Sequence, residues 1–276
     1  MLSTQSKDIS STNSVEVEVL IENVIDDLIS KKWYTTWNEF FEKNIQLIRG
    51  ILYKVYSTDK RVFPDLCDIF RFAENPVDKI KCVFVGMDPY PTAQPEPNKH
   101  MPVATGRSFE VGGVFNWFQS YRQASMRNIL KSLVYYDTGY EYTMEELRIK
   151  NWQGNLHLTE KSDNPHDWFD NMEYRGVVFL NAALTVEEGK PKSHMEIWRV
   201  FMDRVVCFIK EQSPDAKWIL AGNDAQDRFS SLLPEDNIVR CVHPRMSKFV
   251  TQCPFKEVSE VDWTKVYKRI YYGSHI

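Results

Sequence analysis

The chain has 276 residues, of which 43% are hydrophobic and 13% aromatic, enough for one large α/β domain or two small ones. Its formal net charge of -4 differs from the strongly basic composition that is typical of many nucleic-acid-binding proteins, although a local basic patch is sufficient to bind a nucleic acid. No apolar stretch has the length of a membrane span, and the N-terminus lacks a secretory or mitochondrial leader pattern, so we expect a soluble protein with no membrane partner.

The cysteines point to a reducing compartment. There are five, and no two have the CxxC spacing, which argues against a zinc or iron–sulfur site. Cys82, Cys207 and Cys241 lie in apolar runs, and we expect them to be buried free thiols. These features favour an intracellular protein, cytoplasmic or nuclear, without a bound metal.

Taken in chain order, the sequence begins with residues 1–16, which are polar and predict a flexible tail before a domain covering 17–276. Apolar residues at helical spacing then predict helices over 17–30, 40–56, 125–135, 195–210 and 224–232, and a short helix over 65–73. Ser125 is a candidate helix cap. Residues 92–107 are Pro-rich and predict an irregular loop, and 136–167 have no clear period and predict a surface insertion.

Four short apolar runs predict buried strands, over 82–86, 177–180, 217–221 and 237–242. Their alternation with helices indicates a single α/β domain with a central four-stranded parallel sheet flanked by helices. A polar residue follows each strand closely: Asp88, Asn181, Asn223 and His243. Because the carboxyl ends of parallel strands share one edge, we expect these side chains to converge there.

The chemistry of this set suits recognition of a planar heterocycle. Asp88 and His243 are a candidate acid/base pair, and the Asn181 amide offers one donor and one acceptor. Phe109 offers a stacking face, and Met87 and Tyr90 offer pocket walls. Each also has an ordinary interpretation: a solvated turn for Asp88, a turn residue for Asn181, core packing for Phe109. The chain has neither a GxSxG serine nor a Walker glycine loop.

Six segments in order resemble the motifs of the family 1 uracil-DNA glycosylases, over about residues 33–270. They are Val85–Tyr90, Gly106–Phe109, Leu180–Val186, Lys192–His194 with Trp198, Gly222–Gln226 and His243–Ser247. The GxDPYP form of the first is similar to the poxviral branch of that family. The resemblance implies a uracil-DNA glycosylase-like fold and no cofactor.

The resemblance also implies roles for the residues that match. Asp88 would activate or orient water and stabilise the sugar cation, while His243 would donate to uracil O2. Asn181 would read uracil N3–H and O4, Tyr90 would exclude the thymine methyl group, and Phe109 would stack on the flipped base.

The resemblance further implies a DNA interface. Met246 would be the apolar wedge that fills the gap left by the flipped base, although ordinary loop packing is its alternative. Arg245 would supply local positive charge. The other predicted phosphate contacts are Ser125, Ser193, Asn223 and Ser247.

Several positions depart from the family pattern. Met87 stands where the family usually has Gln, and Pro91 where it has His. Pro91 has no N–H, which removes one backbone donor near the proposed water.

From the six motifs together, we expect a monomeric uracil-DNA glycosylase that initiates base-excision repair on single- or double-stranded DNA. Two alternatives stay open: a glycosylase for another modified base, and a DNA-binding or polymerase processivity subunit with weak or no catalysis.

Overall fold

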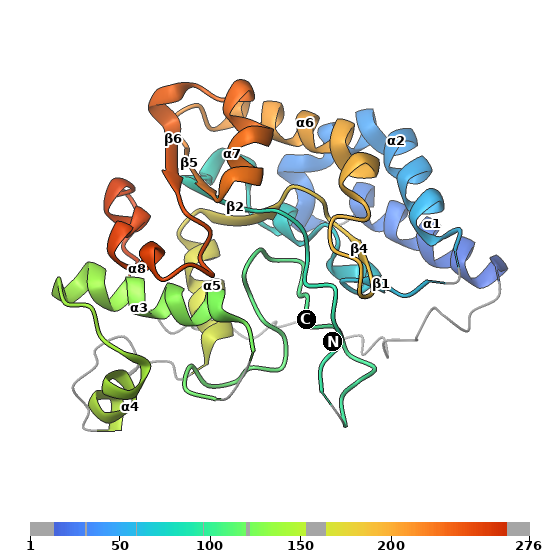
Figure 1. Cartoon of the computed structure of the whole chain (residues 1–276). Coiled ribbons are helices and arrows are strands. Elements are labelled where there is room, and N and C mark those ends of the chain that lie inside the picture. Colours follow the sequence, from blue (N-terminus) through green and yellow to red (C-terminus); the bar gives the residue numbers. More distant parts are fainter. Residues whose placement is uncertain are drawn as a thin grey trace, which may run out of the picture.

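A four-stranded parallel sheet lies at the centre of the structure (Figure 1), as predicted. The computed structural model describes residues 14–30, 32–58, 60–95, 97–119, 122–152 and 164–263. The strand order is β3-β2-β5-β6. The strands are β2 (Cys82–Gly86), β3 (Val177–Asn181), β5 (Lys217–Ala221) and β6 (Ile238–Cys241). Both the strand positions and the α/β fold class are confirmed.

The sheet separates two apolar cores, because successive residues of a strand point to opposite faces. Val83 and Val85 belong to one core, whereas Cys82 and Phe84 belong to the other. Each face is covered by helices, which explains why the strands are apolar throughout rather than alternating.

The helices form a layer on each side of the sheet (Figure 1). The first core is covered by α1 (Ser14–Ser30), α2 (Asn38–Tyr56), α6 (Met195–Gln212) and the short α7 (Asn223–Phe229). The second is covered by α3 (Ala124–Thr138), α4 (Met144–Trp152), α5 (Pro165–Tyr174) and α8 (Lys248–Gln252). Within the described ranges, every helix is too short or too polar to pass through a lipid bilayer.

The predicted surface insertion over 136–167 is exposed at most of its described positions, but it contains helices that its lack of a clear period did not predict. The segment includes α4 and the start of α5; residues 153–163 lie outside the described residues. A local signal begins α5: the Asn164 side chain accepts a hydrogen bond from the His166 N–H at 3.1 Å, and Pro165 occupies the first turn. The helix then buries Trp168, Phe169 and Met172 against β3 and its neighbours.

Other boundaries also differ from the predictions. The tail lies outside the described residues up to residue 13, but 14–16 belong to α1. Instead of one helix over 65–73 there are two 3-10 turns, Leu66–Asp68 and Arg71–Glu74. A small antiparallel pair, β1 (Val62–Phe63) with β4 (Val186–Glu187), was not expected from strands this short. Cys82 and Cys241 are buried as predicted, whereas Cys207 is only half-buried.

Candidate functional site

The carboxyl end of β2 meets that of β3 at Gly86, which pairs in register with Asn181. A Cβ atom at position 86 would lie 2.6 Å from Asn181 Oδ1, 2.9 Å from Ser108 Cβ and 3.4 Å from Phe109 Cζ. A glycine is therefore required for the amide of Asn181 and the ring of Phe109 to lie against the end of β2. Two predicted base-binding residues are thus brought together here.

Phe109 is held in an unusual backbone conformation, with a φ of 66°. The preceding residue anchors it, since Ser108 Oγ donates to the carbonyl of Phe84 at 2.9 Å. The ring packs on Phe84 with centroids 4.7 Å apart and is only 7% exposed. A left-handed non-glycine residue persists only where its surroundings fix it, and such residues concentrate at functional sites.

A buried ion cluster ties this segment to α5. Arg107 is 5% exposed and donates through Nη1 to Glu110 Oε1 at 3.0 Å and through Nε to Glu173 Oε1 at 2.8 Å. Its Nη2 contacts Asp170 Oδ1 at 2.5 Å. Burial favours a neutral Glu110, but Arg107 and a hydrogen bond from His166 outweigh it and hold the Glu110 pKa at about 2. The loop that carries Phe109 is therefore fixed on both sides.

Tyr90 contacts the same segment at Phe109. Its hydroxyl donates to the carbonyl of Phe109 at 3.4 Å. Desolvation raises the pKa of Tyr90 to about 12, although a hydrogen bond with Ser125 acts in the opposite direction. Ser125 is not a cap, because Gln123 precedes the helix and Ser125 lies within its first turn. Ser125 is 5% exposed, and in this conformation its hydroxyl is hydrogen-bonded to Tyr90, a predicted wall of the base pocket.

Asp88 lies just beyond β2, in a turn that contacts the turn after β4. The Lys192 backbone N–H donates to Asp88 Oδ2 at 2.7 Å, and the Gly189 N–H donates to the Pro91 carbonyl at 2.7 Å. Burial raises the pKa of Asp88, and the Lys192 N–H and ammonium oppose that rise. A partly desolvated carboxylate is therefore held in one orientation at the edge of the sheet.

His243 follows β6 and faces Phe109, with ring centroids 5.7 Å apart in an edge-on arrangement. Burial, then the nearby Arg245, lowers the pKa of His243 to about 4, so the ring is neutral at pH 7. The Arg245 backbone N–H donates to His243 Nδ1 at 3.1 Å. Since Nδ1 accepts a hydrogen bond, we infer that the proton of the neutral ring is on Nε2, which becomes the donor.

The remaining predicted residues lie around this group. Met87 is half-buried, and its carbonyl accepts the Ala183 N–H at 3.0 Å. The Ser193 hydroxyl accepts the Glu187 N–H at 2.8 Å. The predicted DNA contacts after β5 and β6 are exposed: Asn223 at the start of α7, and Arg245, Met246 and Ser247 just before α8. The loop after β6 is attached to α3, where Asn128 Nδ2 donates to the Pro244 carbonyl at 2.7 Å.

The sequence patterns missed two charged residues at the site. The Lys192 ammonium pairs with Asp224 Oδ1 at 2.8 Å, and the Asp224 charge acts on both Asp88 and His243. Both Lys192 and Asp224 lie within segments that match the family motifs, and this was the sequence signal that could have identified them. Next to them, His194 is 7% exposed and its Nδ1 lies 2.9 Å from Thr185 Oγ1, the acceptor of Trp198 Nε1, so we interpret His194 as a structural residue.

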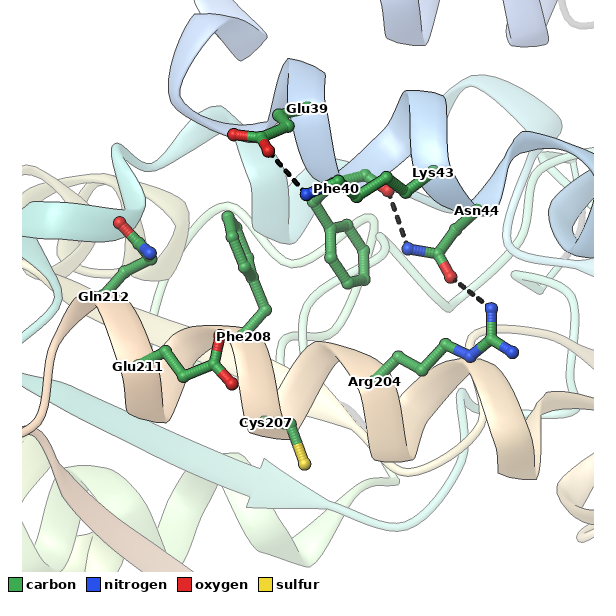
Figure 2. Close-up of a pocket in the computed structure, with 9 residues that line it drawn as sticks. All are labelled: Glu39, Phe40, Lys43, Asn44, Arg204, Cys207, Phe208, Glu211 and Gln212. Atoms are coloured by element: carbon green, nitrogen blue, oxygen red, sulfur yellow. Dashed lines mark hydrogen bonds and ion pairs between the residues drawn. The ribbon is translucent and has the colours of Figure 1, made fainter.

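A separate surface cavity of about 340 Å³ lies between α2 and α6 (Figure 2). Phe40 and Phe208 line it and stack with ring centroids 4.8 Å apart, and Arg204 donates to Asn44 Oδ1 at 2.7 Å. It includes none of the predicted site residues. In the described part of the chain, no group of three or more His, Cys, Asp or Glu side chains is arranged to hold a metal ion.

Curated relatives match most of the chain. A uracil-DNA glycosylase of Alkaliphilus metalliredigens is 29% identical over 223 residues, covering 79% of this chain and 82% of the relative. One of Oceanobacillus iheyensis is 27% identical over 250 residues, covering 84% and 93%. The chain is therefore similar to curated uracil-DNA glycosylases over about four-fifths of its length. No family model matches it.

Solved structures of this group share its fold. The mimivirus uracil-DNA glycosylase aligns with a TM-score of 0.59 at 20% identity, over 79% of this chain and 70% of that one. The wild-type UNG of Nitratifractor salsuginis aligns with a TM-score of 0.60 at 18% identity, over 87% and 96%. The four-stranded sheet with helices on both faces is therefore the uracil-DNA glycosylase fold.

Proposed function

We propose that this protein is a uracil-DNA glycosylase, a hydrolase that breaks the N-glycosidic bond of uracil in DNA and so initiates base-excision repair. The observation that carries the proposal is the convergence of Asn181, Phe109 and His243 at one sheet edge, with Asp88 beside them. The named relatives, which cover about four-fifths of this chain, support it. The sequence motifs favour family 1, and the GxDPYP form favours its poxvirus-like branch.

In this proposal the base pocket is selective because of Asn181 and Tyr90. Uracil presents N3–H beside O4, which matches the acceptor and donor of a planar amide, whereas cytosine presents neither group in that order. Asn181 is 4% exposed, so a mismatched base would leave its polar atoms unpaired in a desolvated place. Tyr90, hydrogen-bonded to the Phe109 carbonyl, would block the 5-methyl group of thymine.

Bond cleavage creates two charges, and the proposed catalytic residues address each. The deoxyribose becomes an oxocarbenium-like cation, which the Asp88 carboxylate stabilises while it orients the attacking water. Uracil departs as an anion, and the neutral His243 donates its Nε2–H to O2. A neutral donor with its Nδ1 already fixed by Arg245 needs no reorientation as charge develops.

The protein would act on DNA as a monomer, with the target base flipped out of the stack. Met246 is 52% exposed on the loop after β6, a suitable position for an apolar wedge. Arg245 and Ser247, exposed beside it, would contact phosphates. Pro91, whose carbonyl is already bonded to Gly189, offers no donor to the water, so we expect a lower rate than in members with His there.

The test is release of uracil from oligonucleotides carrying one uracil, single- and double-stranded, beside thymine and cytosine controls. Asp88→Asn keeps a hydrogen-bond acceptor for the Lys192 N–H but removes the charge, and we expect a loss of about 100-fold or more. Asp227→Asn, an exposed change on α7, is the matched control and should retain full activity. Retained DNA binding with no release of any base would refute the enzyme and favour the processivity subunit.

A further inference from the structure

Lys192 connects two edges of the candidate site. Its backbone N–H holds Asp88 at 2.7 Å, and its ammonium reaches Asp224 at 2.8 Å, at the start of α7. The two paired side chains are 51% and 58% exposed, so the ion pair lies at the surface beside the catalytic carboxylate. The charge of the ammonium also acts on Asp88, so a DNA strand that presents its sugar to Asp88, as in the proposed function, would pass near it.

The backbone at this position indicates that the lysine side chain is kept for a purpose other than folding. Lys192 has a φ of 66°, a left-handed conformation that glycine adopts without strain. An ion pair between two half-exposed side chains adds little to stability and is screened by salt. Stabilisation of the fold therefore explains neither the left-handed backbone of Lys192 nor its ion pair with Asp224.

The charge balance points to a phosphate. The whole chain carries a net charge of -4, so a DNA-binding face needs local cations at the site. Ser193 and Asn223, proposed phosphate contacts, directly adjoin Lys192 and Asp224 in sequence. Asp224 alone would repel a phosphate there, and its pairing with Lys192 neutralises that charge while the site is empty.

We propose that Lys192 is a DNA-phosphate-binding residue, which pairs with Asp224 in the free protein and exchanges that carboxylate for a phosphate of the bound strand. The inference rests on the proposed function for its substrate, and it adds a residue and an exchange of partners to that site. A lysine ammonium is a mobile point charge, suited to changing partners in this way.

The exchange predicts opposite effects for its two members. We would measure the Kd of the full-length protein for a uracil-free single-stranded oligonucleotide, and KM for the uracil-containing one, at several salt concentrations. Lys192→Gln should weaken binding at least about threefold and lower the slope of log Kd against log salt by about 0.7. Asp224→Asn should tighten binding about threefold, because it frees the ammonium and removes a repelling charge.

Two controls separate this role from a structural one. Lys43→Gln disrupts a comparable exposed pair on α2, with Glu39, and should leave the salt slope as in the wild type. Lys192→Gly keeps the N–H that holds Asp88 and relieves the left-handed strain, so it should fold as stably as the wild-type protein and still bind DNA more weakly.

The proposal is overturned if Lys192→Gln leaves the salt slope unchanged, or if Lys192→Gln and Asp224→Asn weaken binding equally, as loss of a structural tie would. The binding measurement uses uracil-free DNA, so it stands even if the wild-type protein releases no uracil. Failure of the proposed function and failure of the phosphate contact are therefore distinguished.

Discussion

Replacing Gly86 by alanine tests whether the end of β2 sets the geometry of the proposed base pocket. The added Cβ would lie 2.6 Å from Asn181 Oδ1 and 2.9 Å from Ser108 Cβ. Ordinary van der Waals contact begins at 3.4 Å, so the Asn181 amide must move by about 0.8 Å. The Ser108 side chain cannot move freely away from the added Cβ, because its hydroxyl donates a hydrogen bond to the Phe84 carbonyl.

The size of the effect depends on this displacement. One extra methyl group in a closely packed place destabilises a protein by about 1–3 kcal/mol. A displacement approaching 1 Å of a residue that orients a substrate lowers the rate by about 10- to 100-fold. We therefore expect Gly86→Ala to remain folded, with its free energy of unfolding reduced by about 1–3 kcal/mol, and to lose most of its activity.

Urea unfolding and the kcat/KM for uracil release would measure both effects. Gly50→Ala is the matched control, because a Cβ at Gly50 meets nothing within 4 Å and the residue is exposed inside α2. It should stabilise the protein by about 0.5–1 kcal/mol and leave activity unchanged. Full activity in Gly86→Ala with unaltered stability would refute the account of the pocket.

Three further changes have expected outcomes. Arg107→Met removes the cation that pairs with the buried Glu110 and Glu173 carboxylates and should lower the free energy of unfolding by about 3–5 kcal/mol, measured in urea. The pKa of His243 is about 4 in the folded protein and about 6.5 when unfolded, so unfolding takes up a proton below pH 6.5. Stability should fall as pH drops from 6.5 to 4, less steeply in His243→Gln. Met246→Ala, at an exposed site, should change stability by less than about 0.5 kcal/mol but reduce activity on duplex more than on single-stranded DNA.

Each of these has a clear contrary result. Arg199→Met, which breaks an exposed pair, is the control for Arg107→Met, and equal losses in the two would contradict the structural importance of the buried cluster. Parallel stability curves for the wild-type protein and His243→Gln between pH 6.5 and 4 would contradict the depressed pKa. A Met246→Ala variant that loses activity equally on both substrates would contradict the wedge.

The sheet and the site edge were predictable because their signals are local. A buried parallel strand is a short apolar run that ends at a glycine or a polar residue, as at Gly86 and Asn181. The rule that ligands bind at the carboxyl ends of parallel strands then predicted where the polar groups meet. Phe109 was proposed as a stacking face, but its left-handed conformation was not predicted, since that conformation depends on contacts distant in sequence.

The features that the sequence did not reveal depend on long-range contacts. Arg107, Glu110 and Glu173 are charged residues in polar segments, and nothing nearby in sequence indicates that they are buried together. Ser125 has the sequence features of a cap, but its hydroxyl hydrogen-bonds to Tyr90. The left-handed Lys192 carries no residue-type signal at all, because lysine rarely adopts that conformation.

The pairing of β2 with β3 has a consequence for how the protein folds. Gly86 and Asn181 are in register, yet most of the second helical layer lies between them in the chain. Closing so long a loop delays strand pairing relative to local helix formation. A slip of one residue in that pairing would also turn the Asn181 side chain to the opposite face. During refolding, helical circular dichroism should therefore recover before uracil release, and the lag between them measures the time taken to reach the correct register.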